Sequence, residues 1–179
     1  MLGSESIMKK IKEDDEMKET IITLENVTKK YEKDIIFSKV NLNINKGESI
    51  AIVGKNGKGK STFLRVVSGI TKIEEGNITY SRKVKFNFVP ENFTKLNITA
   101  RKYISLIADI EGINKKDLDE KLGYLTKEFF LEDMMDTPIK FLSKGTIQKV
   151  SVLQSLLTKP DVLLLDEPLS GLSLIHIFR

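Results

Sequence analysis

Short runs in which apolar and polar residues alternate mark the first half of the chain as rich in strands. Segments 21–24, 40–44, 77–80 and 84–89 are predicted to be strands, with clean alternation in 40–44, and the apolar run 50–53 also reads as a strand. A period of two places apolar side chains on one face, as in a half-buried strand.

Helical spacing replaces this pattern after Pro90. It covers residues 98–131 with a break at 112–114, and a further helix is predicted over 143–157. The apolar run at 161–165 is typical of a strand covered on both faces in a parallel sheet. We therefore expect an α/β fold with a mostly parallel sheet and a helical subdomain inserted at about residues 91–142.

The most specific motif lies between the strand at 50–53 and a helical run that begins at Phe63. It fits the pattern G-x-x-x-x-G-K-[ST], in which glycines let backbone N–H groups surround a phosphate chain. The following helix directs its positive end at the same anion. Lys60 can reach the β- and γ-phosphates, and the Ser61 hydroxyl can hold Mg²⁺. The candidate nucleotide-binding residues are Gly54, Lys55, Asn56, Gly57, Lys58, Gly59, Lys60, Ser61 and Thr62.

Composition narrows the class of protein. The chain has 179 residues, 40% of them hydrophobic and 30% charged, and its length suits one domain. It contains no cysteine, which excludes disulfides, thiolate zinc sites and a cysteine nucleophile. The net charge of +4 comes without a long basic block, so nucleic-acid binding is not favoured. No apolar window is long enough to span a membrane, and the polar residues 1–19 are expected to form a mobile leader.

Two carboxylates follow the apolar run at 162–165. In enzymes with such a phosphate loop, an aspartate in the position of Asp166 helps to hold Mg²⁺, and a carboxylate beside it, here Glu167, can polarise the attacking water. A strand that simply ends at solvent would also explain both residues. The phosphate loop earlier in the chain favours the catalytic interpretation.

Ser143 and Gly145 mark a second possible anion site. A serine that caps the helix at 143–157 is the simpler explanation. A hydroxyl, free N–H groups and a helix dipole also suit a phosphate. Because two helix N-termini cannot usefully approach one γ-phosphate from the same side, this site is predicted to serve the nucleotide of another subunit.

Residues 20–171 resemble the ATP-binding subunit or domain of ABC transporters, with the motifs in the same order. Six segments carry the resemblance: Tyr31 at the adenine-stacking aromatic, 54–62 at Walker A, 89–91 at the Q-loop, Leu142-Ser143-Lys144-Gly145 at the signature, Asp166-Glu167 at Walker B, and Ser170-Gly171-Leu172 at the D-loop.

The resemblance implies a P-loop NTPase core with an antiparallel β subdomain and the helical subdomain. It implies that ATP and Mg²⁺ bind between two such domains arranged head to tail, with Ser143 and Gly145 contacting the partner's nucleotide. Ser61, Asp166 and Glu91 would hold the metal, and Glu167 with Lys60 would carry catalysis. It also implies transmembrane permease subunits as partners and a cytoplasmic location at the inner face of the membrane.

Several residues depart from the family pattern. Glu91 replaces the usual Q-loop glutamine, and Lys144 replaces a signature glycine; both changes favour the branch that exports drugs or bacteriocins. Thr146 replaces the last signature glutamine, and Ser173 stands where the family has aspartate. His176 is the only histidine and lies too close to Glu167 to be the family's switch residue.

The last residues are predicted to be a non-native tail, 172–179. Leu172–Ile177 read as a translation of CTG TCT CTT ATA CAC ATC, which resembles a transposon end used in library preparation. We therefore expect an incomplete domain that lacks a strand beside the Walker strands, leaves a sheet edge exposed, and has poor solubility and little ATPase activity.

Two other classes remain at this stage. An ABC-type ATPase of translation or DNA repair is possible, although the short segment between Pro90 and Ser143 lacks the heptads of repair proteins. A P-loop kinase or GTPase is disfavoured by the signature-like motif at 142–145.

Overall fold

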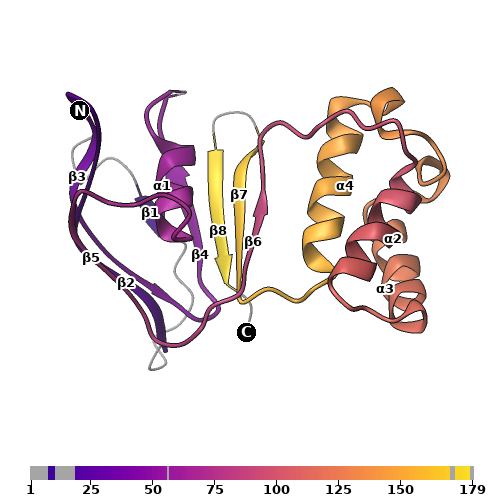
Figure 1. The fold of residues 1–179 in the computed structure, drawn as a ribbon, viewed down its shortest axis with the longest axis horizontal. Coiled ribbons are helices and arrows are strands. Elements are labelled where there is room, and N and C mark those ends of the chain that lie inside the picture. The colour runs from indigo at the N-terminus through magenta and orange to yellow at the C-terminus, as the bar shows by residue number, and fades with distance from the viewer. Residues whose placement is uncertain (1–7, 11–18, 56, 170–171, 178–179) are drawn as a thin grey trace. The chain divides into compact units, whose positions relative to one another are not determined.

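The computed structural model describes residues 8–10, 19–55, 57–169 and 172–177, which belong to two compact units (Figure 1). An α/β unit comprises residues 1–88 and 161–179, and a helical unit comprises residues 89–160. Each unit has its own hydrophobic core. Among the residues that the structure describes, no helix is long and apolar enough to cross a membrane.

Strands dominate the α/β unit, and helices make up most of the other. In chain order the elements are β1 (Met8–Lys10), β2 (Thr20–Tyr31), β3 (Asp34–Asn45), β4 (Ser49–Val53), α1 (Lys60–Val67), β5 (Glu75–Tyr80), β6 (Phe86–Val89), α2 (Ala100–Ile110), α3 (Lys115–Glu128), η1 (Glu132–Met134), η2 (Ile139–Phe141), α4 (Lys144–Leu156), β7 (Val162–Leu169) and β8 (Leu172–Ile177).

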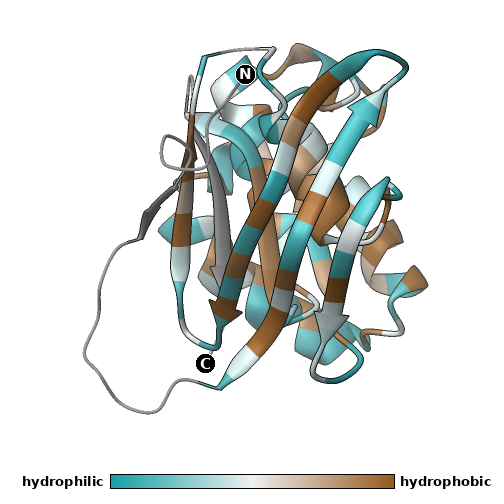
Figure 2. Cartoon of the chain, turned by 90° about the vertical axis from the view of Figure 1, so that its left-hand side faces the viewer, coloured by the Kyte–Doolittle hydropathy of each residue, from teal (hydrophilic) through white to brown (hydrophobic). Residues whose placement is uncertain are grey.

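An antiparallel sheet of order β3-β2-β5 forms one layer of the α/β unit. Ile22 pairs with Ile44 and Leu24 pairs with Leu42, so apolar side chains share a face, and hydrophobic and hydrophilic residues alternate along these strands (Figure 2). Ile22, Leu24 and Ile44 are buried against the core. This is the antiparallel β subdomain that the family resemblance implies, and its strands are longer than the alternation predicted.

The second sheet has the order β1-β4-β8-β7-β6. Strand β8 runs antiparallel to both β4 and β7, so those two strands run parallel to each other. The α/β class is confirmed, but the sheet is mixed rather than mostly parallel, because β8 and β1 pair in the antiparallel sense. The prediction of a vacant place beside the Walker strands, with an exposed edge there, is wrong, because β8 from the predicted tail lies between them. Met8–Lys10, predicted to lie in a leader, instead pair with β4 as strand β1.

The loop between β4 and α1 turns through two glycines with left-handed backbones. Gly57 has φ +74° and Gly59 has φ +92°. A side chain at Gly57 would enter open space, whereas a Cβ at Gly59 would overlap Cγ2 of Ile36. The β3 strand therefore packs directly over the loop at Gly59.

The helical unit contains α2, α3 and α4, which begin at side-chain caps. Thr99, Asn114 and Ser143 each accept a hydrogen bond from a backbone N–H in the first turn of their helix, which supplies a partner for a donor that would otherwise lack one. The predicted helices and the break at 112–114 are present. The unit extends to Pro160, beyond the predicted limit of 142, because α4 shares the core of α2 and α3.

Replacing Gly59 by alanine should be more damaging than replacing Gly57. Both variants place a Cβ on a left-handed backbone, at a cost of about 1–2 kcal/mol, and only Gly59→Ala also collides with Ile36. Urea titrations should therefore show a larger decrease in the free energy of unfolding for Gly59→Ala than for Gly57→Ala. Adding Ile36→Ala should recover part of that loss in the Gly59 variant alone; equal losses in both glycine variants would contradict the contact.

A charged contact joins the start of β7 to the segment before β6. Asp161 accepts from Arg82 at 2.8 Å and from the Lys85 N–H at 2.8 Å, and these bonds hold the pKa of Asp161 below its usual range. Stabilisation from a carboxylate with a lowered pKa is present above its ordinary pKa and is lost as the pH falls through the folded-state value.

Asp161→Asn should accordingly lower the free energy of unfolding by about 1 kcal/mol at neutral pH. In urea titrations the difference from the wild type should shrink as the pH falls below the ordinary pKa of aspartate toward the lowered folded-state value. Glu25→Gln, an exposed acid on β2, is the matched control and should change little. A difference that stays constant with pH would contradict the charged contact.

Candidate nucleotide-binding site

The phosphate loop joins the end of β4 at Val53 to the start of α1 at Lys60. Gly59 caps α1 without a side-chain hydrogen bond, and no acidic residue lies in the first turn. The N–H groups at this end are therefore not capped by a side chain, and the positive end of the helix dipole is not offset by a nearby carboxylate of the helix. Such a helix N-terminus favours the binding of an anion.

Lys60 places its ammonium group inside this loop. Its Nζ donates to the carbonyl oxygens of Gly54 at 3.0 Å and Lys55 at 3.4 Å. It also lies 2.9 Å from Oε1 of Glu167, with the two side chains only 3% and 12% exposed. A buried ammonium needs such partners, because removing a charge from water is costly unless it is paired and hydrogen-bonded.

The Ser61 hydroxyl donates to Oδ1 of Asp166 at 2.8 Å. This contact brings the phosphate loop and the carboxylates of β7 together, as predicted from their order in the sequence. A hydroxyl and a carboxylate oxygen are hard ligands that suit Mg²⁺, which usually keeps several waters and binds substrate phosphates as well. No group of three or more His, Cys, Asp or Glu that could hold a metal occurs among the described residues.

Glu167 reaches Lys60 from an unusual backbone position. Its φ is +48°, in the left-handed region, and the pairing of β7 with β8 shifts register between Leu165 and Leu169. A left-handed conformation costs a residue with a Cβ roughly 1–2 kcal/mol, so the surrounding contacts must stabilise it. Such strain is characteristic of functional sites, and here it accompanies the contact with Lys60.

An open pocket with a cavity volume of about 180 Å³ lies at this point. Its lining consists of Ile36, Gly57, Gly59, Lys60, Ser61, Thr62 and Glu167. Ile36 is the one lining residue that sequence reasoning missed; its signal is an apolar residue close to the exposed tip of the β2–β3 hairpin.

Tyr31 ends β2, and its side chain is 49% exposed. The ammonium of Lys29 lies 4.6 Å from the centre of its ring. Sequence reasoning also missed Lys29, which lies two residues before Tyr31 on the same strand. The role of Tyr31 on adenine stays a prediction, and Asn56 of the phosphate loop lies outside the described residues.

The remaining predicted site residues, Glu91, Ser143 and Gly145, belong to the helical unit. Ser143 caps α4 by accepting from the Thr146 N–H at 3.1 Å, so the simple N-cap explanation holds. A side chain at Gly145 would meet open space. Their contact with a partner's nucleotide stays a prediction, and Ser170 and Gly171 of the D-loop lie outside the described residues.

Comparison with known proteins identifies the family. The family model described as ABC transporter matches residues 37–170. The zinc import ATP-binding protein ZnuC of Rickettsia bellii is 35% identical over 159 residues, covering 87% of this chain and 66% of the relative. The maltose/maltodextrin import ATP-binding protein MalK of Photorhabdus laumondii is 32% identical, covering 84% of this chain and 44% of the relative.

Solved structures agree on the fold. One described as the ATP-binding subunit of an ABC transporter has a TM-score of 0.70 at 23% identity, over 85% of this chain and 68% of that one. The chain spans just under two thirds of the ZnuC relative and less than half of the MalK relative. With three quarters of its length matched by the family model, the chain belongs to the ABC transporter family and contains its ATP-binding domain.

Proposed function

We propose that this chain is the ATP-binding part of a subunit that binds ATP with Mg²⁺, hydrolyses it, and so powers a membrane transporter; the 179 residues by themselves are expected to show little turnover. The observation that supports this most directly is the pair of contacts that join its two nucleotide motifs. Lys60 lies 2.9 Å from Glu167, and Ser61 lies 2.8 Å from Asp166. A lysine, a hydroxyl and two carboxylates at one loop are the groups that phosphoryl transfer requires.

The proposed chemistry starts with an exchange of partners by Lys60. A phosphate oxygen takes the place of the Glu167 carboxylate beside the ammonium, and the N–H groups at the start of α1 contact the same phosphates. Glu167 would then orient or deprotonate the attacking water. Ser61 and Asp166, with Glu91, would hold Mg²⁺, which neutralises charge on the β- and γ-phosphates when bound. Catalysis is then mainly positioning and electrostatic stabilisation.

A second ATP-binding domain completes the proposed site. Ser143 and Gly145 at the start of α4 would contact the γ-phosphate held by that partner, with the two domains head to tail. Tyr31 would stack on adenine. Closure of the dimer would act on permease subunits through the region of Glu91. The chain would then work in the cytoplasm, at the inner face of the membrane that holds those subunits.

Export is the direction that we propose, on the basis of Glu91 and Lys144, which depart from the usual family residues. Two relatives named above carry import in their names, so the direction needs a separate test. A neighbouring gene for a membrane protein without one for a solute-binding protein would support export. A solute-binding protein that is required for transport would contradict it.

Glu167→Gln should keep ATP binding and lose about 10²–10⁴-fold of turnover, because the general base is removed while Lys60 remains. Lys60→Ala should weaken ATP binding itself by about tenfold or more, since it deletes a charge-assisted contact to phosphate. Calorimetric titration and phosphate release, measured with the partner domains present, check both. Full turnover by Glu167→Gln would remove that residue from its proposed role.

The contact with a partner nucleotide can be tested at Gly145. Gly145→Asp adds a carboxylate in open space at the start of α4, where the helix dipole tolerates it, so the fold should persist. In the Glu167→Gln background the added charge should repel the partner's γ-phosphate and prevent dimerisation by MgATP, as seen by light scattering.

The matched control is Gly123→Asp, which also adds a carboxylate to open space on a helix of the same unit. It should leave the ATP-driven dimer unchanged. A dimer that tolerates Gly145→Asp as well as it tolerates Gly123→Asp would contradict the proposed role of the signature segment.

A further inference from the structure

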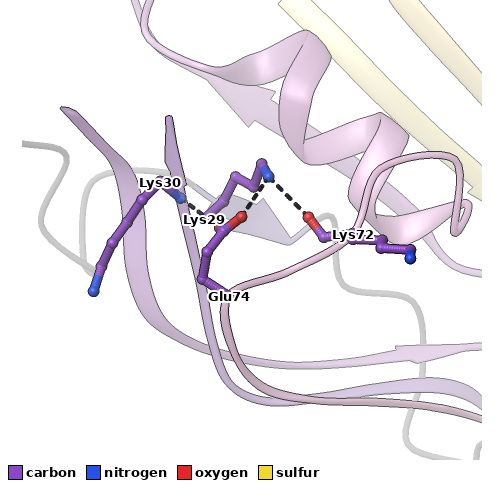
Figure 3. Close-up of polar contacts among 4 residues, drawn as sticks. All are labelled: Lys29, Lys30, Lys72 and Glu74. Atoms are coloured by element: carbon purple, nitrogen blue, oxygen red, sulfur yellow. Dashed lines mark hydrogen bonds and ion pairs between the residues drawn. The ribbon is translucent and has the colours of Figure 1, made fainter. Parts of the chain in front are cut away.

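Lys29 is a buried lysine outside the phosphate loop. Its side chain is 6% exposed, and its Nζ donates to Oε1 of Glu74 at 2.8 Å and to the Lys72 carbonyl at 2.9 Å (Figure 3). The second oxygen of Glu74 accepts from the Lys30 N–H at 2.7 Å. These bonds to Lys29 and Lys30 hold the pKa of Glu74 below its ordinary value. The carboxylate therefore stays charged at neutral pH and anchors the ammonium.

The same ammonium lies over the ring of Tyr31, 4.6 Å from its centre. A cation at this distance from an aromatic face is attracted by the electron density of the ring. Tyr31 is 49% exposed, so the ring retains surface for a ligand while one contact restrains it from within. A restrained aromatic ring loses less conformational freedom when a ligand stacks on it.

The bonds of Lys29 also connect the tip of the hairpin to the phosphate loop. In the β2–β3 ladder Lys29 pairs with Phe37, and Lys30 pairs with Ile35. Ile36 between those partners lines the pocket. Phe37 packs edge to face on Phe63 of α1, with ring centres 5.4 Å apart.

On the other side, Lys72 follows α1 in the chain. Its carbonyl accepts from Lys29, and the neighbouring Thr71 N–H donates to the carbonyl of Arg65 in α1. Lys29 thus ties the strand that ends in Tyr31 to the helix whose first residues hold the phosphates.

We propose that Lys29 is a positioning residue that holds the Tyr31 ring for stacking on a purine base. The inference rests on the proposed function, in which Tyr31 contacts adenine. Lys29 does not touch the nucleotide and acts through Tyr31. A buried ion pair that serves the fold alone would stabilise the protein equally but would not distinguish a base from a bare phosphate chain.

The experiment compares two probes, MgATP and inorganic tripolyphosphate with Mg²⁺, by calorimetric titration of the 179-residue chain. Lys29→Met removes the ammonium and keeps the apolar stem. It should weaken MgATP binding about three- to tenfold and leave tripolyphosphate affinity unchanged, because only ATP carries a base. In a Tyr31→Ala background the same substitution should have no further effect on ATP.

Lys30→Met is the matched control, since Lys30 is a neighbouring lysine of the same strand whose ammonium instead pairs with Glu75 at 2.7 Å. It should bind both probes as the wild type does. Glu74→Gln provides a second variant if Lys29→Met does not fold. Because it removes the charge that anchors Lys29, it should lower the affinity for MgATP by about two- to threefold and leave the affinity for tripolyphosphate unchanged.

The outcomes separate this proposal from the proposed function. The role of Lys29 would be overturned if Lys29→Met lowered the affinity for both probes equally or for neither. It would also be overturned if the loss of MgATP affinity persisted in the Tyr31→Ala background. A wild-type chain that binds neither probe would contradict nucleotide binding itself. Tyr31→Ala with normal ATP affinity would contradict base stacking, and the role of Lys29 with it.

Discussion

The ammonium group of Lys60 is a charge buried in the α/β unit, and much of the site can be understood as what keeps it stable there. A lone charge in this position would be costly, so the loop supplies the carbonyl oxygens of Gly54 and Lys55, and β7 supplies Glu167. To reach Lys60, Glu167 adopts a left-handed backbone at a shift in register. The path of the loop and the irregularity of β7 therefore both serve to surround the Lys60 ammonium with oxygen atoms.

A second buried lysine stabilises the other end of α1. Lys60 begins the helix, whereas Lys29 bonds to the carbonyl of Lys72 beyond its end. Each ammonium is paired with a glutamate from elsewhere in the chain, Glu167 or Glu74, at 2.8–2.9 Å. The helix is thus anchored by charged contacts at both ends, while Phe63 packs into the core between them. The helix whose first residues are proposed to contact the phosphates is therefore already fixed in place.

Local periodicity predicted the α/β class and the helices. The family resemblance, rather than any local pattern, implied that the two nucleotide motifs meet. Sequence reasoning underestimated β2 and β3, since register shifts after Leu24 interrupt the alternation that marks a strand. It missed Lys29 and Ile36, whose places depend on pairing across the hairpin. It also missed β8 beside β4, because strand order in a sheet is a long-range property that alternation does not encode.

Strand β8 has a geometric consequence for the metal ligands. One strand lies between β4 and β7, so the strand that leads into the phosphate loop and the strand that carries Asp166 are held two strand spacings apart, about 9–10 Å. Ser61 nevertheless contacts Asp166, because the loop and the first turn of α1 bridge that width. The middle strand therefore acts as a spacer. The pairing of this strand with β4 and β7 fixes the distance that the loop and the first turn of α1 must bridge for Ser61 to reach Asp166.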